Sequence, residues 1–226
     1  MLEVKNICKK YGKVEILRDV NFTLTPSECI CIVGSNGSGK STLLSIIAGA
    51  IDPDKGNIIN TEHNRIGYVP QDNILFEELT VMDNLKFWYA AYGLDNKLIF
   101  TEDSIESMLD LKGFSCKKVN ILSGGMKKRV SLAISLCHHP NYLVLDEPCN
   151  SLDIIYRNEI IDYLKLLKSI GIGIIISTHS STEIEALCDK LLVLKSGCAS
   201  LYEEPKQLFQ NNTANIEHLL VELIKK

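Results

Sequence analysis

Long apolar runs are missing from this sequence, and so is any strong bias toward one sign of charge. The longest apolar stretches, such as residues 172–177, have the length of a strand and fall far short of the roughly 20 residues that a membrane-spanning helix needs. The N-terminus alternates apolar and polar residues and has no apolar stretch behind a charged head, so we predict a first strand there and no secretion signal. These absences favour a cytosolic chain.

Excess positive charge is also absent. The 24 Lys and Arg residues are outnumbered by 28 Asp and Glu residues, which gives a formal net charge of -4. A chain of this charge lacks the global positive field of a dedicated nucleic-acid binder, although a local basic patch stays compatible with it. With 226 residues, 46% of them hydrophobic, the chain is long and apolar enough to bury a substantial core.

Clustered metal ligands are lacking as well, although the sequence contains eight cysteines. The cysteines are scattered, none forms a Cys-x-x-Cys pair, and most lie in apolar stretches, so we expect buried, reduced thiols. His138 and His139 are adjacent, so they point in different directions, and no cysteine pair is close to them in sequence. We expect no metal site built from these residues.

Short β-branched runs that alternate with helical patterns are what the sequence does contain. Predicted strands at residues 29–33, 142–146 and 173–177 each precede a helical pattern, the first beginning at Gly39 and the second at Asp153. This alternation is typical of an α/β fold with a parallel sheet.

Between residues 77 and 139 the strand patterns give way to helical ones, at 81–92, 102–111 and 124–137. We therefore predict one domain over residues 1–226, with a sheet lobe at 1–76 and 140–212, an inserted helical subdomain at 77–139 and a C-terminal helix at 213–226. Ile216, Leu219, Leu220 and Leu223 share one face of that last helix. We expect it to pack on its own domain, with docking to a partner as the alternative.

A phosphate-binding loop is indicated where the first of these strands ends. Glycines there allow backbone N–H groups to turn inward, and the start of a helix adds partial positive charge. Lys40 would reach the β- and γ-phosphates, Ser41 would bind Mg²⁺, and Thr42 would add a phosphate contact. A flexible Gly/Ser turn is the alternative, but the placement between strand and helix disfavours it. The motif is Gly34-Ser35-Asn36-Gly37-Ser38-Gly39-Lys40-Ser41.

Two adjacent carboxylates end the strand at residues 142–146. In this position Asp146 would bind Mg²⁺ through water, and Glu147 would orient the attacking water and accept its proton. An acidic strand end that caps the next loop is the alternative, and the preceding phosphate loop argues against it.

The segment Leu122-Ser123-Gly124-Gly125-Met126 resembles the LSGGQ signature of the ABC ATPase family. Other landmarks of that family follow its order over nearly the whole chain. They are the aromatic Tyr11, Gln71 in YVPQD, Ser151-Leu152-Asp153 after the carboxylate pair, and His179 in STH.

This resemblance implies a fold and a reaction. The fold is α/β, with a P-loop NTPase core whose mixed sheet is mainly parallel, with antiparallel N-terminal strands, and with an inserted α-helical subdomain. The reaction is ATP hydrolysis with Mg²⁺, in which two chains close as a dimer around two ATP molecules. Ser123, Gly124 and Gly125 would then meet the γ-phosphate of ATP that is held by the other protomer.

Four further roles follow from the resemblance alone. Tyr11 would stack on adenine, and Gln71 would contact Mg²⁺ and the attacking water while linking the two lobes. His179 would hold the γ-phosphate, and Asp153 would lie at the dimer seam. The sequence departs from the family pattern at Met126, in place of Gln, and at Cys149, commonly Thr.

Neither departure lies in the phosphate-binding core of its motif, so we expect hydrolysis to survive. Cys149 adjoins the carboxylate pair, so its oxidation would slow ATP hydrolysis. The favoured interpretation is that Cys149 is a small space-filling residue.

Met126, the basic triplet Lys127-Lys128-Arg129 and residues 79–93 are similar to ATPases of bacterial exporters of drugs, peptides or polysaccharides. The resemblance thus implies a subunit on the inner face of the cell membrane that drives transport, export more than import, through separate transmembrane permease subunits. Trp88 would contact such a partner or pack inside the helical lobe. The triplet has a second interpretation as the solvated face of a helix.

Three questions stay open in the sequence. The chain's ATPase partner is either a second copy or a different chain, so both a homodimer and a heterodimer are compatible with it. A non-transport ABC ATPase acting on ribosomes or DNA is the alternative function, although no nucleic-acid partner is expected. An ATP-responsive interaction module with negligible turnover is the residual one.

Overall fold

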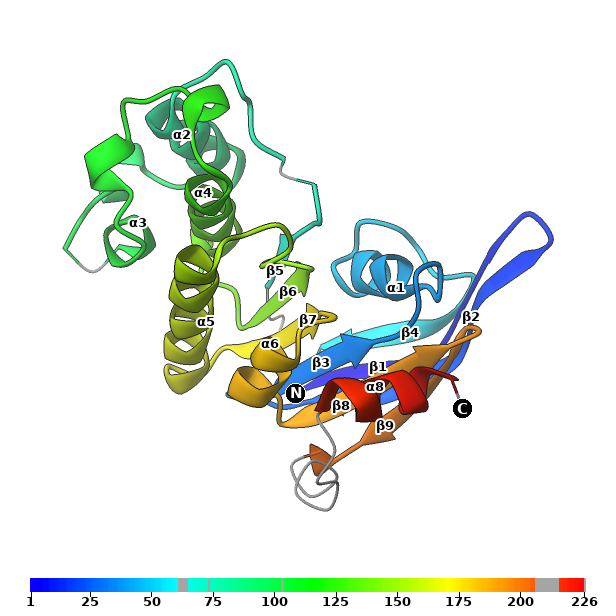
Figure 1. Cartoon of the computed structure of the whole chain (residues 1–226). Helices are drawn as coiled ribbons and strands as arrows, with labels where there is room; N and C mark the ends of the chain where they lie inside the picture. Colours follow the sequence, from blue (N-terminus) through cyan, green and yellow to red (C-terminus); the bar gives the residue numbers. More distant parts are fainter. Residues whose placement is uncertain (61–64, 73, 103, 206–215, 226) are drawn as a thin grey trace.

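The computed structural model describes residues 1–60, 65–72, 74–102, 104–205 and 216–225. Its larger sheet has the strand order β5-β6-β7-β3-β8-β9 (Figure 1). Neighbouring strands are parallel except for β8 and β9, which are antiparallel. The strands are β3 (Cys29–Val33), β5 (Ile66–Val69), β6 (Tyr142–Asp146), β7 (Gly173–Ser177), β8 (Lys190–Lys195) and β9 (Cys198–Tyr202).

A second sheet is built from the N-terminal part of the chain. It has the order β2-β1-β4, with antiparallel pairs formed by β1 (Leu2–Tyr11), β2 (Val14–Leu24) and β4 (Lys55–Asn60). The predicted fold class is confirmed: a mixed, mainly parallel sheet is accompanied by antiparallel N-terminal strands and by helices.

The central strands lie where the sequence predicted them because their residues are apolar throughout. Every residue of β3, β6 and β7 is buried, as expected for parallel strands that are covered on both faces. The helices that follow begin one residue later than predicted. Gly39 precedes α1 (Lys40–Ile47), and Asp153 is the N-cap of α5 (Ile154–Ser169).

Side chains alternate between two cores on either side of β3. Ile30 and Ile32 face a core shared with α1 and the antiparallel sheet. Cys29, Cys31 and Val33 face a second core, which includes residues of α5, of α6 (Ser181–Leu187) and of the helices between β5 and β6. The loop after β3 is therefore held from both faces of the sheet.

Helices fill the segment between β5 and β6 and lie to one side of the sheets (green in Figure 1). They are α2 (Val81–Ala91), α3 (Ile105–Met108) and α4 (Gly124–Leu136), with short 3-10 helices at Asn96–Leu98, Lys112–Phe114 and Val119–Ile121.

One of these helices is much shorter than predicted. Residues 102–111 were expected to be helical, but α3 spans only Ile105–Met108. Ser104 caps its start by accepting a hydrogen bond from the backbone N–H of Ser107, and the left-handed backbone of Asp110 (φ 51°) stops the helix from continuing. Residue 103 lies outside the described residues.

The C-terminal helix α8 (Ile216–Lys225) packs on the domain beside β8. Leu219 and Leu220 are buried. Leu220 belongs to the core that contains Cys29, Cys31 and Val33, and Ile216 and Leu223 pack against that core. This arrangement matches the predicted apolar face. Residues 213–215 and 226 of that prediction lie outside the described residues. Within the described ranges, no helix combines the length and the apolar composition that crossing a membrane requires.

Candidate functional site

The phosphate-loop motif forms the turn between β3 and α1, and several of its glycines are required there. Gly37 and Gly39 have positive φ values of 78° and 103°, which favour glycine. A Cβ atom on Gly34 would lie 2.3 Å from the backbone oxygen of Leu194 and 2.6 Å from Ser38 Oγ. The loop backbone at Gly34 thus lies so close to β8 that any side chain at this position would clash with it.

A cavity of about 590 Å³ lies over this loop. Ser38, within the loop, is buried, and its Oγ has no hydrogen-bond partner among the described residues. The cavity brings together much of the predicted phosphate loop, Gln71 and Glu147. Its lining is formed by Ile16, Asn36, Gly37, Gly39, Lys40, Ser41, Thr42, Gln71, Glu147 and Asn150.

Lys40 is a buried cation that lines the cavity. Its Nζ donates hydrogen bonds to the carbonyl oxygens of Gly34 (2.9 Å) and Ser35 (3.3 Å). Burial lowers the pKa of Lys40, although the charges of Glu147 and Asp146 oppose that shift. An ammonium group has three donors, so Lys40 keeps one for an anion in the cavity.

The carboxylate pair at the end of β6 is held by the neighbouring strand β7. Ser177 Oγ donates a hydrogen bond to Asp146 Oδ1 at 2.5 Å. The backbone N–H of Glu147 donates to the backbone carbonyl oxygen of Ser177 (3.2 Å) and to its Oγ (3.0 Å). Glu147 has a φ of 46°, a left-handed conformation that costs a residue with a side chain roughly 1–2 kcal/mol. Ser177 stabilises that conformation.

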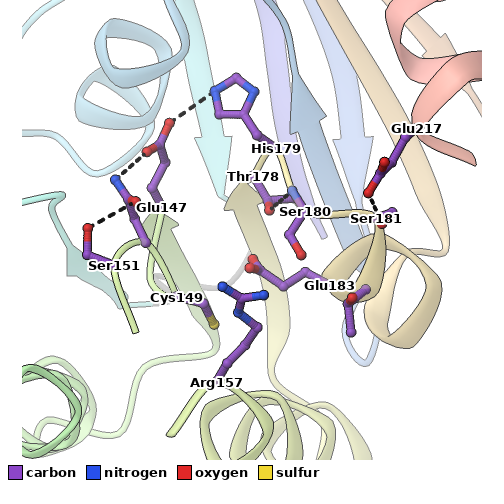
Figure 2. A pocket seen from close by; sticks show the side chains of 12 residues that line it. Glu147, Cys149, Ser151, Arg157, Thr178, His179, Ser180, Ser181, Glu183 and Glu217 are labelled. Atoms are coloured by element: carbon purple, nitrogen blue, oxygen red, sulfur yellow. Dashed lines mark hydrogen bonds and ion pairs between the residues drawn. The ribbon is translucent and has the colours of Figure 1, made fainter. Parts of the chain in front are cut away.

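The Glu147 side chain is oriented by two donors (Figure 2). His179 Nε2 lies 3.1 Å from Glu147 Oε1, and Asn150 Nδ2 donates to Glu147 Oε2 at 3.0 Å. Glu147 and His179, which the sequence separates by more than 30 positions, are therefore in direct contact at the carboxyl ends of β6 and β7.

Other predicted site residues lie apart from this cavity. In the described part of the chain, its lining does not include Tyr11, the Ser123-Gly124-Gly125 segment or Asp153. Tyr11 ends β1 with a half-exposed ring, Ser123 caps α4 by accepting from Met126 N–H (3.3 Å), and Asp153 caps α5 by accepting from Tyr156 N–H (3.0 Å). A single chain does not unite these groups with the phosphate loop.

Two lining residues were not predicted. Ile16, on β2, reaches the loop because β2 crosses close to Gly39, a tertiary contact with no local signal in the sequence. Asn150 follows Glu147 in a tight turn that is closed by a 3.1 Å backbone hydrogen bond between the two residues. Asn150 could have been predicted as a site residue, because it is an amide three positions after the predicted catalytic carboxylate Glu147.

The basic triplet on α4 is not a solvated face, so that interpretation was wrong. Lys127 forms a 2.7 Å ion pair with Glu77, and Lys128 is buried, where burial lowers its pKa. The Arg129 guanidinium lies over the rings of Phe114 (5.4 Å) and Tyr156 (6.0 Å). The triplet instead connects α4 to its neighbours inside the fold.

Cys149 is a buried thiol beside the carboxylate pair. Its side chain is 2% exposed, and burial, together with the nearby Glu183, raises the pKa of Cys149 to about 12. A thiol of such high pKa stays protonated and unreactive at physiological pH. These properties favour the space-filling interpretation.

All eight cysteines are free, and most of them are buried, as expected. Cys116 and Cys198 are the exposed ones, and Cys8 is partly buried. Over the described ranges, no group of three or more His, Cys, Asp or Glu side chains has the arrangement of a metal site.

Trp88 packs against the core of the helical region. Its ring contacts Phe87 (5.6 Å between centroids) and Tyr92 (6.1 Å), while Phe87 and Phe76 are exposed. Of the two interpretations of Trp88, internal packing is the one that the structure supports.

Comparisons with known proteins agree with this architecture. A family model described as ABC transporter matches residues 17–150. The chain is 34% identical over 224 residues to the Nod factor export ATP-binding protein I of Bradyrhizobium diazoefficiens, covering 93% of this chain and 72% of that protein. It is 33% identical over 239 residues to the spermidine/putrescine import ATP-binding protein PotA of Clostridium acetobutylicum, covering 97% and 68%.

A solved structure gives the same result for the fold. The ATP binding subunit of an ABC transporter superposes with a TM-score of 0.83 at 27% identity, covering 99% of both chains.

Proposed function

Because the chain belongs to the ABC transporter family of ATP-binding proteins, we propose that it hydrolyses ATP and thereby drives transport through separate transmembrane subunits. One observation carries the proposal. The phosphate loop and Glu147 line the same cavity, and His179 Nε2 lies 3.1 Å from that carboxylate. Phosphate binding and water activation thus meet in one place.

The phosphates of ATP would bind to the loop between β3 and α1. Its backbone N–H groups lie at the start of a helix, where partial positive charge favours anions. Lys40 has a free donor for the β- and γ-phosphates, and Ser38 and Thr42 supply hydroxyl groups. Tyr11 would stack on the adenine ring.

The residues around the cavity fit a magnesium ion that enters with ATP. Ser41 and Gln71 line the cavity, and Asp146 is near enough for its charge to act on Lys40. They offer hydroxyl, amide and carboxylate oxygens, the ligand types that Mg²⁺ prefers, and water would lie between Asp146 and the ion. When bound, Mg²⁺ neutralises charge on the phosphates.

Glu147 would act as the general base on the attacking water, which Gln71 helps to orient. Asn150 orients one carboxylate oxygen of Glu147, and His179 now occupies the other. If His179 instead donates to the γ-phosphate, Glu147 Oε1 is left free to accept the proton of the water. The same histidine thus switches partners as ATP binds.

A second ATPase chain would complete the site. Ser123, Gly124 and Asp153 are exposed and lie outside the cavity of their own chain, as residues that serve a partner's ATP would. Gly125 continues the same helix start. ATP would join two protomers, identical or different, and hydrolysis would separate them, which is a power stroke.

The membrane partner would dock beside Gln71 and the start of α2, at the inner face of the membrane. Exposed apolar side chains, among them Phe76, Leu79 and Phe87, lie in this region. We propose export rather than import because Met126 and residues 79–93 are similar to exporter ATPases. The relatives include both an export and an import ATP-binding protein, so their names do not decide the direction.

The E147Q variant tests the catalytic part of the proposal. Removing the base should lower kcat by about 10²–10⁴-fold, while ATP binding persists and a dimer accumulates in ATP and Mg²⁺. ATPase assays and size-exclusion chromatography measure these effects. E185Q, an exposed residue of α6 with the same chemical change, is the matched control and should behave as wild type. An E147Q protein that stays monomeric in saturating ATP contradicts dimer closure.

A pull-down tests the transport part. Tagged E147Q protein is incubated with ATP, Mg²⁺ and detergent-solubilised host membranes, and the bound proteins are identified by mass spectrometry. A polytopic membrane protein supports the proposal. Ribosomal or DNA-associated proteins in its place would instead favour a non-transport ABC ATPase.

A further inference from the structure

A second cavity, of about 340 Å³, lies beside the Glu147–His179 contact and contains a buried acid (Figure 2). Glu183 is the third residue of α6 and lines this cavity with a side chain that is only 4% exposed. Its Oε2 atom has no hydrogen-bond partner within the described part of the chain. The mechanism above makes no use of this carboxyl group.

The groups around Glu183 come from the two loops that carry the catalytic pair. Thr178 directly precedes His179, and Cys149 follows Glu147 by two residues. Thr178 Oγ1 already accepts a hydrogen bond from Ser180 N–H (3.0 Å), so its hydroxyl proton is free to be donated to Glu183. Cys149 lines the same cavity as Glu183 and lowers the pKa of that carboxyl group.

Arg157, on α5, adds a third element to this arrangement. Its guanidinium lies close enough to Glu183 and Cys149 to act on the pKa of both groups. Figure 2 shows Arg157 pointing into the space between them. Burial nevertheless raises the pKa of Glu183, against the effects of Thr178, Arg157 and Cys149.

The geometry points to Glu183 as a positioning residue for ATP hydrolysis, which ties the loop after β6 to the loop after β7 so that Glu147 and His179 both stay within reach of the γ-phosphate. The inference rests on the proposed ATPase function and extends it. Glu147 and His179 belong to separate loops, and a shift of either loop would separate them. Glu183 lines one cavity together with Thr178, the residue next to His179, and Cys149, which is near Glu147, and it does not line the 590 Å³ phosphate cavity.

Steady-state ATPase kinetics of E183A and E183Q test this inference. E183A should lower kcat at least tenfold and leave the KM for ATP within threefold of wild type, because the phosphate loop is untouched. E183Q keeps the size of the side chain and an oxygen that accepts a hydrogen bond from Thr178, so it should retain at least half of the wild-type kcat. E185A, an exposed position of the same helix, is the matched control.

A second variant removes the Thr178 hydroxyl group in place of the Glu183 carboxyl group. T178V loses the hydroxyl donor but keeps the volume, and it should lower kcat as E183A does. In the double variant the two losses should not multiply, since both break one connection. T178V also serves if E183A fails to fold.

Two results would overturn the inference. One is an E183A or T178V protein with wild-type kcat, and the other is a loss in which KM rises in step with the fall in kcat. A readout independent of turnover is the ¹⁵N chemical shift of His179 Nε2, which should change in E183A if its contact with Glu147 loosens. An inactive wild-type protein would instead refute the proposed ATPase function, and this inference with it.

Discussion

Ser177 fixes the backbone on which the proposed chemistry depends. It is fully buried, donates its hydroxyl to Asp146 and accepts the backbone N–H of Glu147 at both of its oxygens. The left-handed conformation of Glu147 is thereby supported by the adjacent strand, in addition to the turn that Asn150 closes. The backbone from which the Glu147 side chain projects is therefore fixed by the sheet, and His179 and Asn150 orient the side chain itself.

The cysteines should differ sharply in reactivity. Cys116 and Cys198 are exposed, whereas Cys149 is buried and has a pKa raised to about 12, which keeps it in the unreactive thiol form. A short pulse of iodoacetamide on the folded protein should therefore modify Cys116 and Cys198 and leave Cys149 unmodified until denaturant is added. Peptide mapping by mass spectrometry gives the extent at each position.

C149S provides the functional control for that experiment. If Cys149 is a space-filling residue, peroxide should change the ATPase rates of wild type and C149S equally. Rapid labelling of Cys149 in the folded state, or protection from peroxide that is specific to C149S, would restore the redox interpretation.

The sequence predicted those site residues whose signal lies within one motif. Asp146 and Glu147 stand at the end of one apolar strand, and Lys40 ends the glycine-rich loop after another, so the strand pattern also predicted their place at the sheet edge. Ile16 and Glu183 could not be predicted, because each reaches the site through packing between elements distant in sequence. Their residue types are ordinary for a strand and for the first turn of a helix.

The start of α4 packs closely against the start of α5. A Cβ atom on Gly125 would lie 2.4 Å from the Tyr156 ring carbon Cγ, whereas one on Gly124 would have Leu152 Cδ2 at 3.4 Å as its nearest neighbour. The signature segment and the Asp153 cap of α5 are thus joined by a contact that only glycine at position 125 allows.

G125A should consequently destabilise the fold, and G124A should not. Forcing a methyl group into the packed ring costs about 1–3 kcal/mol, while an added methyl at ordinary contact distance changes stability by about 0.5 kcal/mol or less. Urea unfolding followed by circular dichroism measures the two midpoints. Equal midpoints for the two variants would mean that the Tyr156 ring moves aside freely and that its contact with Gly125 does not constrain the packing of α4 on α5.

Helix boundaries were predicted less well than strands. The strands β3, β6 and β7 are short apolar runs with clear ends, and their predicted residues match the structure. The helical pattern over 102–111 included both a capping serine at 104 and a residue, Asp110, that adopts a left-handed conformation, so only one turn forms. The solvated-face interpretation of the triplet at 127–129 failed because its neighbours come from distant segments.

The whole molecule places the phosphate loop at the centre of its larger sheet. β3 lies between β7 and β8 and contributes to both hydrophobic cores, so the loop after it is ordered only while the entire sheet is intact. A ligand bound to this loop therefore binds the folded chain and not the unfolded one. Its binding free energy adds directly to the stability of the whole fold.

ATP with Mg²⁺ should raise the melting temperature of the protein as a result. At a concentration 100 times its Kd, a ligand stabilises the folded state by about 2.7 kcal/mol, and each kcal/mol raises Tm by about 2–4 °C in a chain of this size. We expect a shift of about 5–10 °C in wild type. K40A should lose most of it, because Lys40 supplies the buried positive charge in the lining of the cavity. K165A, which removes an exposed lysine of α5, should keep it. Differential scanning fluorimetry over a range of ATP concentrations gives these shifts, and a full shift in K40A would mean that ATP binds elsewhere.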